Sequence, residues 1–227
     1  MTSKQQADCI LLLSGGIDST TLLADLVERG RRPLCLIFDY GQTLQKEVKI
    51  AADNATRYGC EWETYFTPMP WAMDTCALLD DGEEVDRIPN GRTVEQIEEG
   101  GTPDTYVPFR NGIFLAYAVA MGEAMGIQHI YCGGNGLNSG NYYDDTTAFA
   151  RMFQMAADEG TSPDYHPAII YPYADMPKSA IVEIGRGLGV DYGQTWSCYR
   201  NGDKPCGTCD SCAQRQHAFH NAGLPRN

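Results

Sequence analysis

A short apolar run, followed by a glycine turn and a helix start, sets the fold class of this chain. Residues Cys9–Leu13 are continuously apolar, as expected of a parallel strand covered on both faces. The next six residues, 14–19, read Ser-Gly-Gly-Ile-Asp-Ser, and apolar residues at helical spacing then run to Gly30. Amide N–H groups of such a turn converge on one point, where the helix dipole adds positive potential. Segment 14–19, here termed the phosphate loop, is therefore a predicted phosphate-binding site.

The phosphate loop lacks the lysine of the usual G-x-x-x-x-G-K-[S/T] loop. Asp18 instead offers a carboxylate that could hold Mg²⁺ against a polyphosphate. The S-G-G-x-D-S pattern resembles that of the PP-loop ATP pyrophosphatases, which implies cleavage of ATP between its α- and β-phosphates. The alternative is a glycine turn in an inert α/β domain. The residues predicted to hold ATP and magnesium are Ser14, Gly15, Gly16, Asp18 and Ser19.

Apolar runs alternate with helix-like segments along most of the chain. After the first strand and helix, we expect strands at 34–38, 61–66, 128–132 and 168–171, and helices at 44–58, 113–125, 146–158, 178–186 and 213–222. This alternation predicts an α/β fold with a doubly wound, mostly parallel sheet. Ligands of such sheets bind beyond the carboxyl ends of the strands, where Ser14, Asp39 and Gly133 are expected to gather.

Residues 67–108 break the alternation with five prolines and many acidic residues. A long irregular insertion in a compact domain is a functional lid or a mobile loop, and the sequence favours neither. We expect an ATP pyrophosphatase-like domain at 1–190 that carries this insertion, followed by a metal-binding segment at 191–227.

Four of the nine cysteines lie within fifteen residues near the end of the chain: Cys198, Cys206, Cys209 and Cys212. Four thiolates complete a tetrahedral Zn²⁺ site of the structural type. An iron–sulfur cluster is the rival interpretation. The odd number of cysteines argues against a disulfide framework. Segment 198–212, here termed the cysteine knuckle, is predicted to hold zinc and to pin the tail to the body of the protein.

Charge and hydropathy bound the choice of partners. Thirty acidic and 17 basic residues give a net charge of −13, so we expect no nucleic-acid partner, because phosphate-backbone binding depends on lysine and arginine. No stretch approaches the roughly 20 apolar residues of a membrane span, and residues 1–8 lack the pattern of a signal peptide. We therefore expect a cytoplasmic protein without a membrane partner.

Five blocks together are similar to those of the 7-cyano-7-deazaguanine synthase family of queuosine biosynthesis. They are Tyr40-Gly-Gln42, Val107-Pro-Phe-Arg-Asn111, Met176-Pro-Lys-Ser-Ala-Ile181, Thr195-Trp-Ser-Cys-Tyr199 and Cys206-Gly-Thr-Cys-Asp-Ser-Cys-Ala-Gln-Arg215. The resemblance spans nearly the whole chain and implies an adenine-nucleotide α-hydrolase-like fold. It also suggests a homodimer. Ammonia would be free or delivered by a partner, since the chain carries no glutaminase signature.

The resemblance implies ATP-dependent conversion of 7-carboxy-7-deazaguanine to the nitrile. The carboxylate is adenylated, ammonia displaces AMP to give the amide, and a second adenylation drives dehydration. Arg110 and Lys178, together with Asp18, are the catalytic candidates, because the two cations could neutralise the substrate carboxylate or the α-phosphate. Surface salt bridges are the alternative for both cations. Tyr40 and Gln42 are further candidates for the nucleotide.

The sequence departs from the family pattern in one loop. The family segment Glu-Thr-Asp-Tyr-Ser-Gly-Tyr-Pro-Asp-Cys-Arg here reads Gly136-Leu-Asn-Ser-Gly-Asn-Tyr-Tyr-Asp-Asp-Thr146. One carboxylate becomes Asn138 and the arginine becomes Thr146, while Asp144 keeps its place. A guanine-like edge presents N–H donors that Asp144 could accept, although a loop-surface aspartate is the alternative. Arg110, Asn111, Asn138 and Asp144 are the substrate candidates.

The altered loop leaves other functions open. One is a paralogue that activates a deazaguanine acid and passes it to another amine, such as an amine on a protein. Another is a catalytically silent nucleotide-binding scaffold that keeps the zinc segment for partner contact. A tRNA-thiolating enzyme fits the charge poorly.

Overall fold

The computed structural model describes residues 6–79, 90–135, 142–200 and 202–225. Five parallel strands form one sheet in the order β3-β2-β1-β4-β5. They are β1 (Cys9–Leu12), β2 (Pro33–Asp39), β3 (Glu61–Phe66), β4 (His129–Cys132) and β5 (Ala168–Ile170). The predicted α/β fold with a parallel sheet is confirmed, and β1, which precedes the phosphate loop, lies at the centre of the sheet.

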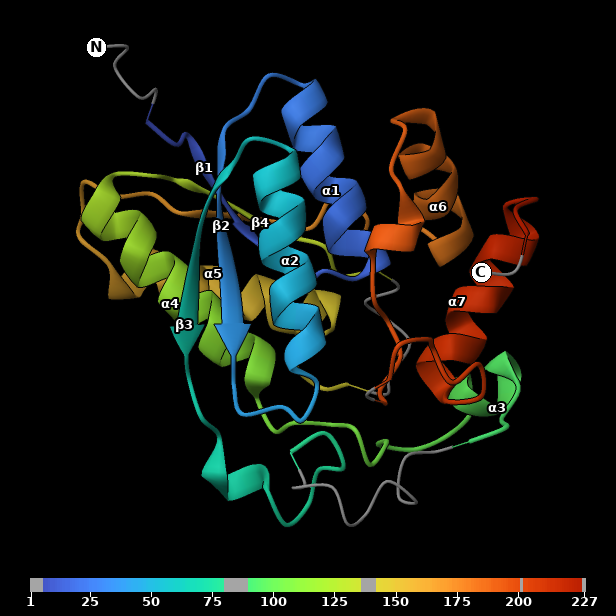
Figure 1. Ribbon diagram of the computed structural model, residues 1–227. Coiled ribbons are helices and arrows are strands. Elements are labelled where there is room, and N and C mark those ends of the chain that lie inside the picture. Colours follow the sequence, from blue (N-terminus) through green and yellow to red (C-terminus); the bar gives the residue numbers. More distant parts are fainter. Residues whose placement is uncertain (1–5, 80–89, 136–141, 201, 226–227) are drawn as a thin grey trace.

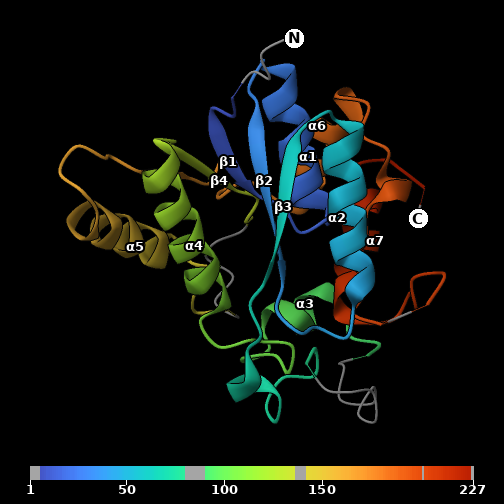
Figure 2. The same ribbon diagram turned by 60° about the vertical axis from the view of Figure 1, so that its left-hand side comes forward.

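Helices cover both faces of the sheet (Figures 1 and 2). On one side lie α1 (Ile17–Glu28), α2 (Gln45–Arg57) and α6 (Lys178–Gly187), with α7 (Asp210–Asn221) packed beside α6; on the other lie α4 (Arg110–Met125) and α5 (Thr147–Gly160). Alternate residues of β1 pack against the helices on opposite faces of the sheet, because successive side chains of a strand point to opposite faces. Ile10 packs in the core cluster with Leu115 of α4, and Leu11 packs with Leu22 of α1.

Helix α4 begins at Arg110, three residues before the predicted start. Its N-cap residue Phe109 has a left-handed backbone (φ 57°) and provides no capping side chain. The Asp144 carboxylate caps the helix from another segment, since its Oδ2 accepts the backbone N–H of Asn111 at 2.7 Å. A cap supplied from 33 residues away leaves no local signal in the sequence.

The insertion at 67–108 contains more regular structure than the sequence predicts. A small core of buried residues joins it to the body: Tyr40, Met69, Ala72, Cys76, Leu78, Leu79 and Val107. A short helix, α3 (Val94–Glu98), begins with a capping box between Thr93 and Gln96. The prediction of a wholly irregular insertion is therefore wrong for its second half.

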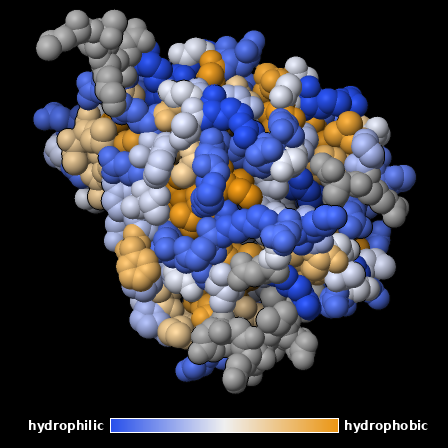
Figure 3. Space-filling view, viewed as in Figure 1, coloured by the Kyte–Doolittle hydropathy of each residue, from blue (hydrophilic) through white to orange (hydrophobic). Residues whose placement is uncertain are grey.

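The face of the molecule seen in Figure 3 is mostly hydrophilic, with small separate hydrophobic areas. Within the described part of the chain, no helix combines the length and the apolar character needed to cross a bilayer.

Candidate active site and metal centre

A cavity of about 360 Å³ opens at the carboxyl ends of β1, β2 and β4. It is here termed the first cavity. Eight of the residues predicted for ATP, magnesium or substrate line it: Ser14, Gly16, Asp18, Ser19, Tyr40, Gln42, Arg110 and Asn111. The fold therefore brings the start of α1, the loop after β2 and the start of α4 to one site. This is the position expected of a ligand in an open parallel sheet.

The phosphate loop is held by its own short contacts. The Ser14 and Ser19 hydroxyls lie 3.0 Å apart, and the Ser14 N–H donates to Ser19 Oγ at 3.2 Å. Gly15 has φ +77°, and a Cβ there would lie 2.9 Å from the carbonyl oxygen of Glu47, so only glycine fits. The N-cap of α1 is Gly16, which has no side chain to cap the helix, so the first amide N–H groups of α1 are left for an anion.

The approach of β4 to the phosphate loop is equally close. A Cβ on Gly133, just after β4, would lie 2.9 Å from the backbone nitrogen of Ser19. Gly133 lines the first cavity as expected. Asp39 is absent from its walls, because the Asp39 carboxylate turns back to accept the N–H of Gly41 at 3.1 Å.

Asp18 and Lys178 form an ion pair beside the phosphate loop. Lys178 Nζ donates to Asp18 Oδ2 at 2.6 Å, and the two side chains are 27% and 17% exposed. The other carboxylate oxygen, Asp18 Oδ1, is buried and has no hydrogen-bond partner among the described residues. An unpaired buried carboxylate oxygen beside free amide donors fits a hard cation such as Mg²⁺ held against a polyphosphate.

The lining of the first cavity also includes a cation, Arg110, beside buried polar groups. Arg110 Nη1 donates to the Tyr40 hydroxyl at 3.1 Å. The Gln42 amide accepts the N–H of Tyr40 at 2.8 Å and donates to Glu47 at 3.1 Å, so it holds the loop after β2. Burial raises the pKa of Glu47 to about 7, against the lowering effect of the Arg110 charge.

The altered loop places its two neighbouring aspartates differently. Asp144 is 3% exposed, caps α4 and is absent from the walls of the first cavity, so its contact with a substrate base stays a prediction. Asp145, which the sequence analysis did not single out, lines that cavity. Burial and the charge of Asp144 raise the pKa of Asp145 to about 6. The sequence signal that could have marked Asp145 as a candidate is its departure from the family segment, which has cysteine at this position. Asn138 lies outside the described residues.

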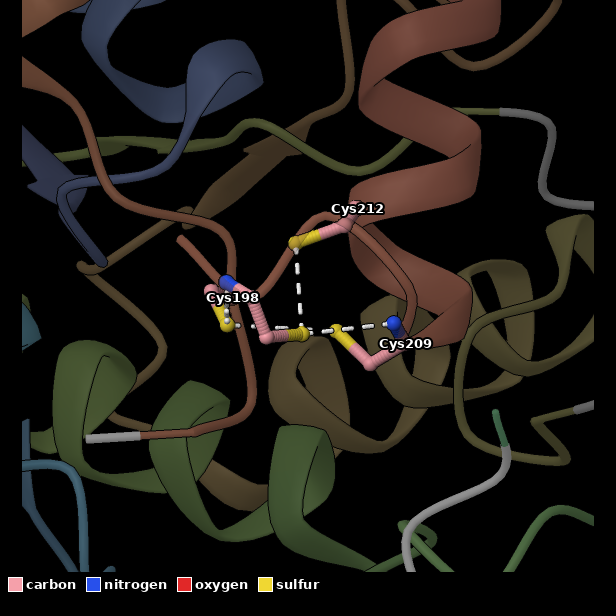
Figure 4. Close-up of side chains that lie close together, drawn as sticks. Cys198, Cys209 and Cys212 are labelled. Atoms are coloured by element: carbon pink, nitrogen blue, oxygen red, sulfur yellow. Dashed lines mark hydrogen bonds between the residues drawn. The ribbon is translucent and has the colours of Figure 1, made fainter. Parts of the chain in front are cut away.

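The four predicted metal ligands converge in the cysteine knuckle. Their Sγ atoms all lie within 4.8 Å of one another. Cys198 comes from a loop, Cys209 is the N-cap of α7, and Cys212 lies in its first turn (Figure 4). The Cys206–Cys212 and Cys198–Cys209 sulfur pairs are 3.9 and 4.0 Å apart.

These distances suit a single metal ion. Around one tetrahedral ion with metal–sulfur bonds near 2.3 Å, neighbouring sulfurs lie about 3.8 Å apart. Hydrogen bonds from the Cys209 and Cys212 thiols, and then from the amides of Cys206 and Arg200, lower the pKa of Cys198. A thiolate is the form that binds metal. The four cysteines of the knuckle could therefore hold a metal ion.

The segment that leads into the knuckle is bonded to the phosphate loop. The Trp196 N–H donates to the carbonyl oxygen of Gly15 at 3.0 Å, and Lys46 Nζ lies 3.7 Å from the centre of the Trp196 ring. The buried guanidinium of Arg215 on α7 donates to Thr195 Oγ1 at 2.9 Å. Metal centre and phosphate loop are thus parts of one packed unit.

Comparisons with known proteins agree with this arrangement. The model of the family described as "Queuosine biosynthesis protein QueC" matches residues 8–223. The chain is 35% identical over 226 residues to a 7-cyano-7-deazaguanine synthase of Porphyromonas gingivalis, covering 98% of this chain and 96% of that protein. A second such synthase, of Thermoplasma acidophilum, is 35% identical over 221 residues, covering 96% and 90%.

A likeness in fold extends to a solved structure of NMN synthetase from Francisella tularensis. The TM-score is 0.50 at 16% identity, with 97% of this chain and 79% of that chain covered. The fold is that of the PP-loop and adenine-nucleotide α-hydrolase proteins. With the matching family model spanning nearly the whole sequence, the chain belongs to the QueC family of queuosine biosynthesis proteins.

Proposed function

We propose that this protein uses ATP to adenylate the carboxylate of 7-carboxy-7-deazaguanine and converts the product, with ammonia, to 7-cyano-7-deazaguanine. The name of its relatives and the match over 98% of the chain support the product. The observation that carries the ATP chemistry is the pairing of an uncapped α1 N-terminus with the unpartnered Asp18 Oδ1 in one cavity.

In the first step a carboxylate oxygen of the acid attacks the α-phosphorus, and the bond between that phosphorus and the bridging oxygen to the β-phosphate breaks. The phosphate loop would hold the β- and γ-phosphates through the α1 amides and the Ser14 and Ser19 hydroxyls, which stabilises pyrophosphate as it leaves. A magnesium ion bound at Asp18 would supply positive charge to the same phosphates.

Two cations flank the reacting groups. Lys178 already donates to Asp18, and when the carboxylate of Asp18 turns to a metal ion, the ammonium group is free to contact the α-phosphate or the acid. Arg110, in the lining of the first cavity, offers a second cation. Neutralising two anions that must approach each other is the main electrostatic task of an adenylation step.

In the second step ammonia attacks the acyl carbon, AMP leaves with the electron pair of the C–O bond, and one proton is released. The amide oxygen then attacks the α-phosphorus of a second ATP and displaces pyrophosphate, and loss of AMP and of both protons of the amide nitrogen yields the nitrile. Adenylation supplies the leaving group each time, so this chain's residues need only orient the reactants and exclude water.

The experiment is turnover of ATP with the acid and ammonium, followed by mass analysis of the base and identification of the nucleotide products. We expect the nitrile, AMP and pyrophosphate. ADP with orthophosphate would contradict the proposal, as would full activity of an Asp18→Ala variant.

We further propose that the metal of the cysteine knuckle is zinc. The sulfur spacing of about 4 Å supports a single ion, because an iron–sulfur cluster distributes its thiolates over several irons. Elemental analysis of protein purified without added metal tests this. We expect about one zinc and no iron per chain; stoichiometric iron with a visible absorbance band would refute it.

A different acceptor amine is the second candidate function. The observation that favours it is the altered loop, in which Asp145 lines the first cavity and Thr146 caps α5 through a bond from the Phe149 N–H at 3.0 Å. These residues stand where the family segment has cysteine and arginine. A product mass that shows the acid joined to an added peptide amine, with no nitrile from ammonium, would favour this candidate.

A further inference from the structure

A second cavity, of about 260 Å³, lies next to the first and is not explained by the nucleotide chemistry. Three segments form most of its wall: residues 92–103 of the insertion, residues 176–179 at the start of α6, and α7; Asn135, Tyr142 and Tyr199 complete it. In Figures 1 and 2, α3 lies beside α7 although more than a hundred residues separate them. The second cavity therefore exists only because the insertion returns to the cysteine knuckle.

Three contacts hold the insertion against the knuckle. Asn90 forms an antiparallel bridge with the metal ligand Cys209, and the Gly91 N–H donates to the carbonyl oxygen of Thr208 at 2.8 Å. Arg92 makes an ion pair with Asp210, whose side chain is 7% exposed. The wall of the second cavity is thus fixed to the first turn of α7, next to the metal.

The second cavity adjoins the phosphate loop through shared groups. Lys178 lines it while its Nζ lies 2.6 Å from Asp18 Oδ2 in the first cavity. Tyr199 lines both cavities. A ligand in the second cavity would therefore have one end within reach of the phosphates without occupying the volume of the nucleotide.

The lining has the chemistry of a site for a small planar heterocycle. Drug-sized ligands occupy pockets of roughly 300–1,000 Å³, so this one suits a smaller molecule. Aromatic and apolar side chains form part of the wall: Ile97, Tyr142, Met176, Pro177, Tyr199 and Ala218. Side chains that both donate and accept hydrogen bonds form another part: Asn135, Ser179, Gln214, His217 and Asn221. A guanine-like edge also combines donors and acceptors, so the two sets are complementary.

Arg92 and Lys178 are the cations that the described residues bring to this lining, which also carries the carboxylates of Glu98 and Asp210. Arg92 is neutralised by Asp210, whereas Lys178 is paired with the carboxylate that we assign to a metal ion. A carboxylic acid bound here would place its charged end at Lys178 and its ring between the insertion and α7.

We propose that the second cavity binds the acid substrate, a bicyclic heteroaromatic carboxylate with a guanine-like edge, while the first cavity binds ATP. This inference rests on the proposed function for the identity of the acid. It gives the insertion and the cysteine knuckle a shared role, since together they build the acid site.

The two histidines of α7 provide a matched test. His217 lines the second cavity, whereas His220, one turn further along the helix, is absent from the walls of both cavities; both side chains are exposed. In a His217→Trp variant the larger ring would fill the cavity; His220→Trp makes the same change on the solvent side. We expect the KM for the acid in ATP–pyrophosphate exchange to rise at least tenfold in His217→Trp, with the KM for ATP changed by less than twofold. His220→Trp should match the unsubstituted protein in both.

Direct binding of 7-carboxy-7-deazaguanine by calorimetry separates this inference from the proposed function. If the unsubstituted protein binds the acid but shows no exchange, and His217→Trp abolishes binding, the acid site stands and the adenylation proposal fails. If exchange occurs and His217→Trp equals His220→Trp in its KM for the acid, the acid site is wrong. Gln214→Leu, which removes one amide from the wall, covers the case in which His217→Trp does not fold, and an unchanged KM for the acid in that variant would also overturn the inference.

Discussion

The two cavities are adjacent but are built in different ways. The reactive end of the first comes from the consecutive residues 14–19, held between β1 and α1 by contacts that span five residues. The second takes its walls from segments near positions 95, 178 and 215, joined through the cysteine knuckle. A site built from one continuous turn depends on local backbone geometry, whereas a site built from distant segments depends on the contacts that hold those segments together. Different substitutions should therefore abolish ligand binding in the two cavities.

The largest effect is expected from removing a metal ligand. Cys209 is fully buried, is one of the four cysteines that could hold a metal ion, and forms the bridge to Asn90. Cys209→Ser should release the metal, lower the free energy of unfolding by about 5 kcal/mol, and weaken acid binding far more than ATP binding, which the knuckle supports only through the Trp196 contact with Gly15. Metal content, urea unfolding and calorimetry with each ligand would measure this.

The control is Cys60→Ser, because Cys60 is a partly exposed cysteine outside the metal centre. It should keep the metal and both binding sites. Equal loss of ATP and acid binding in Cys209→Ser would show that the cavities are not independently held.

Asp18→Ala should disable the first cavity and leave the second intact. It removes the unpartnered carboxylate oxygen assigned to magnesium and frees Lys178. We expect the rate of acid-dependent exchange to fall by roughly 100-fold or more, about 3 kcal/mol of transition-state stabilisation. Circular dichroism should show an unchanged fold, and calorimetry should show that the acid still binds. Loss of acid binding here would contradict the division into two sites.

Arg92→Ala should loosen the second cavity alone. It leaves the Asp210 carboxylate, 7% exposed, without its ion-pair partner, which we expect to cost about 2 kcal/mol in the free energy of unfolding. Affinity for the acid should fall with it, and affinity for ATP should not. Arg29→Ala is the comparison, because the Arg29 side chain is 68% exposed in its pair with Asp25 and its removal should cost about 0.5 kcal/mol. Similar urea midpoints for the two variants would show that the Arg92–Asp210 ion pair does not hold the insertion against α7.

The last prediction, on stability alone, concerns Glu47, in the wall of the first cavity. Its pKa rises from an ordinary value near 4.5 to about 7 in the folded protein, chiefly because of burial. Between these values the folded state binds more protons than the unfolded state, so this group's contribution to stability is complete below pH 4.5 and is lost as the pH rises through 7.

Glu47→Gln removes that dependence. Between pH 5 and pH 8 the variant should lose less unfolding free energy than the unsubstituted protein, by up to about 2.5 kcal/mol. Urea unfolding at both pH values provides the measurement. A difference between the two proteins that does not change with pH would show that Glu47 does not titrate in this range.

Much of this architecture could be predicted because its signals are local. The strand before Ser14, the glycine turn and the helix start lie within one short segment, and the four cysteines lie within fifteen residues. Helix α4 and the insertion were predicted less well. The cap of α4 comes from Asp144, and α3 is held at the knuckle by Asn90 and Arg92. Such long-range contacts leave no periodicity to read in the sequence.

The sequence by itself determined the order of the strands and the main helices, and it predicted the phosphate loop and the four-cysteine cluster, since each follows from residue types at fixed short spacings. Only the tertiary structure decided which of two neighbouring aspartates lines the first cavity and that a second cavity exists. The Asp144 carboxylate caps α4, whereas Asp145 lines the first cavity. The local backbone direction, and not the residue type, sets where each of these neighbouring side chains points. The second cavity required the insertion to pack on α7, a contact between segments that the chain holds more than a hundred residues apart.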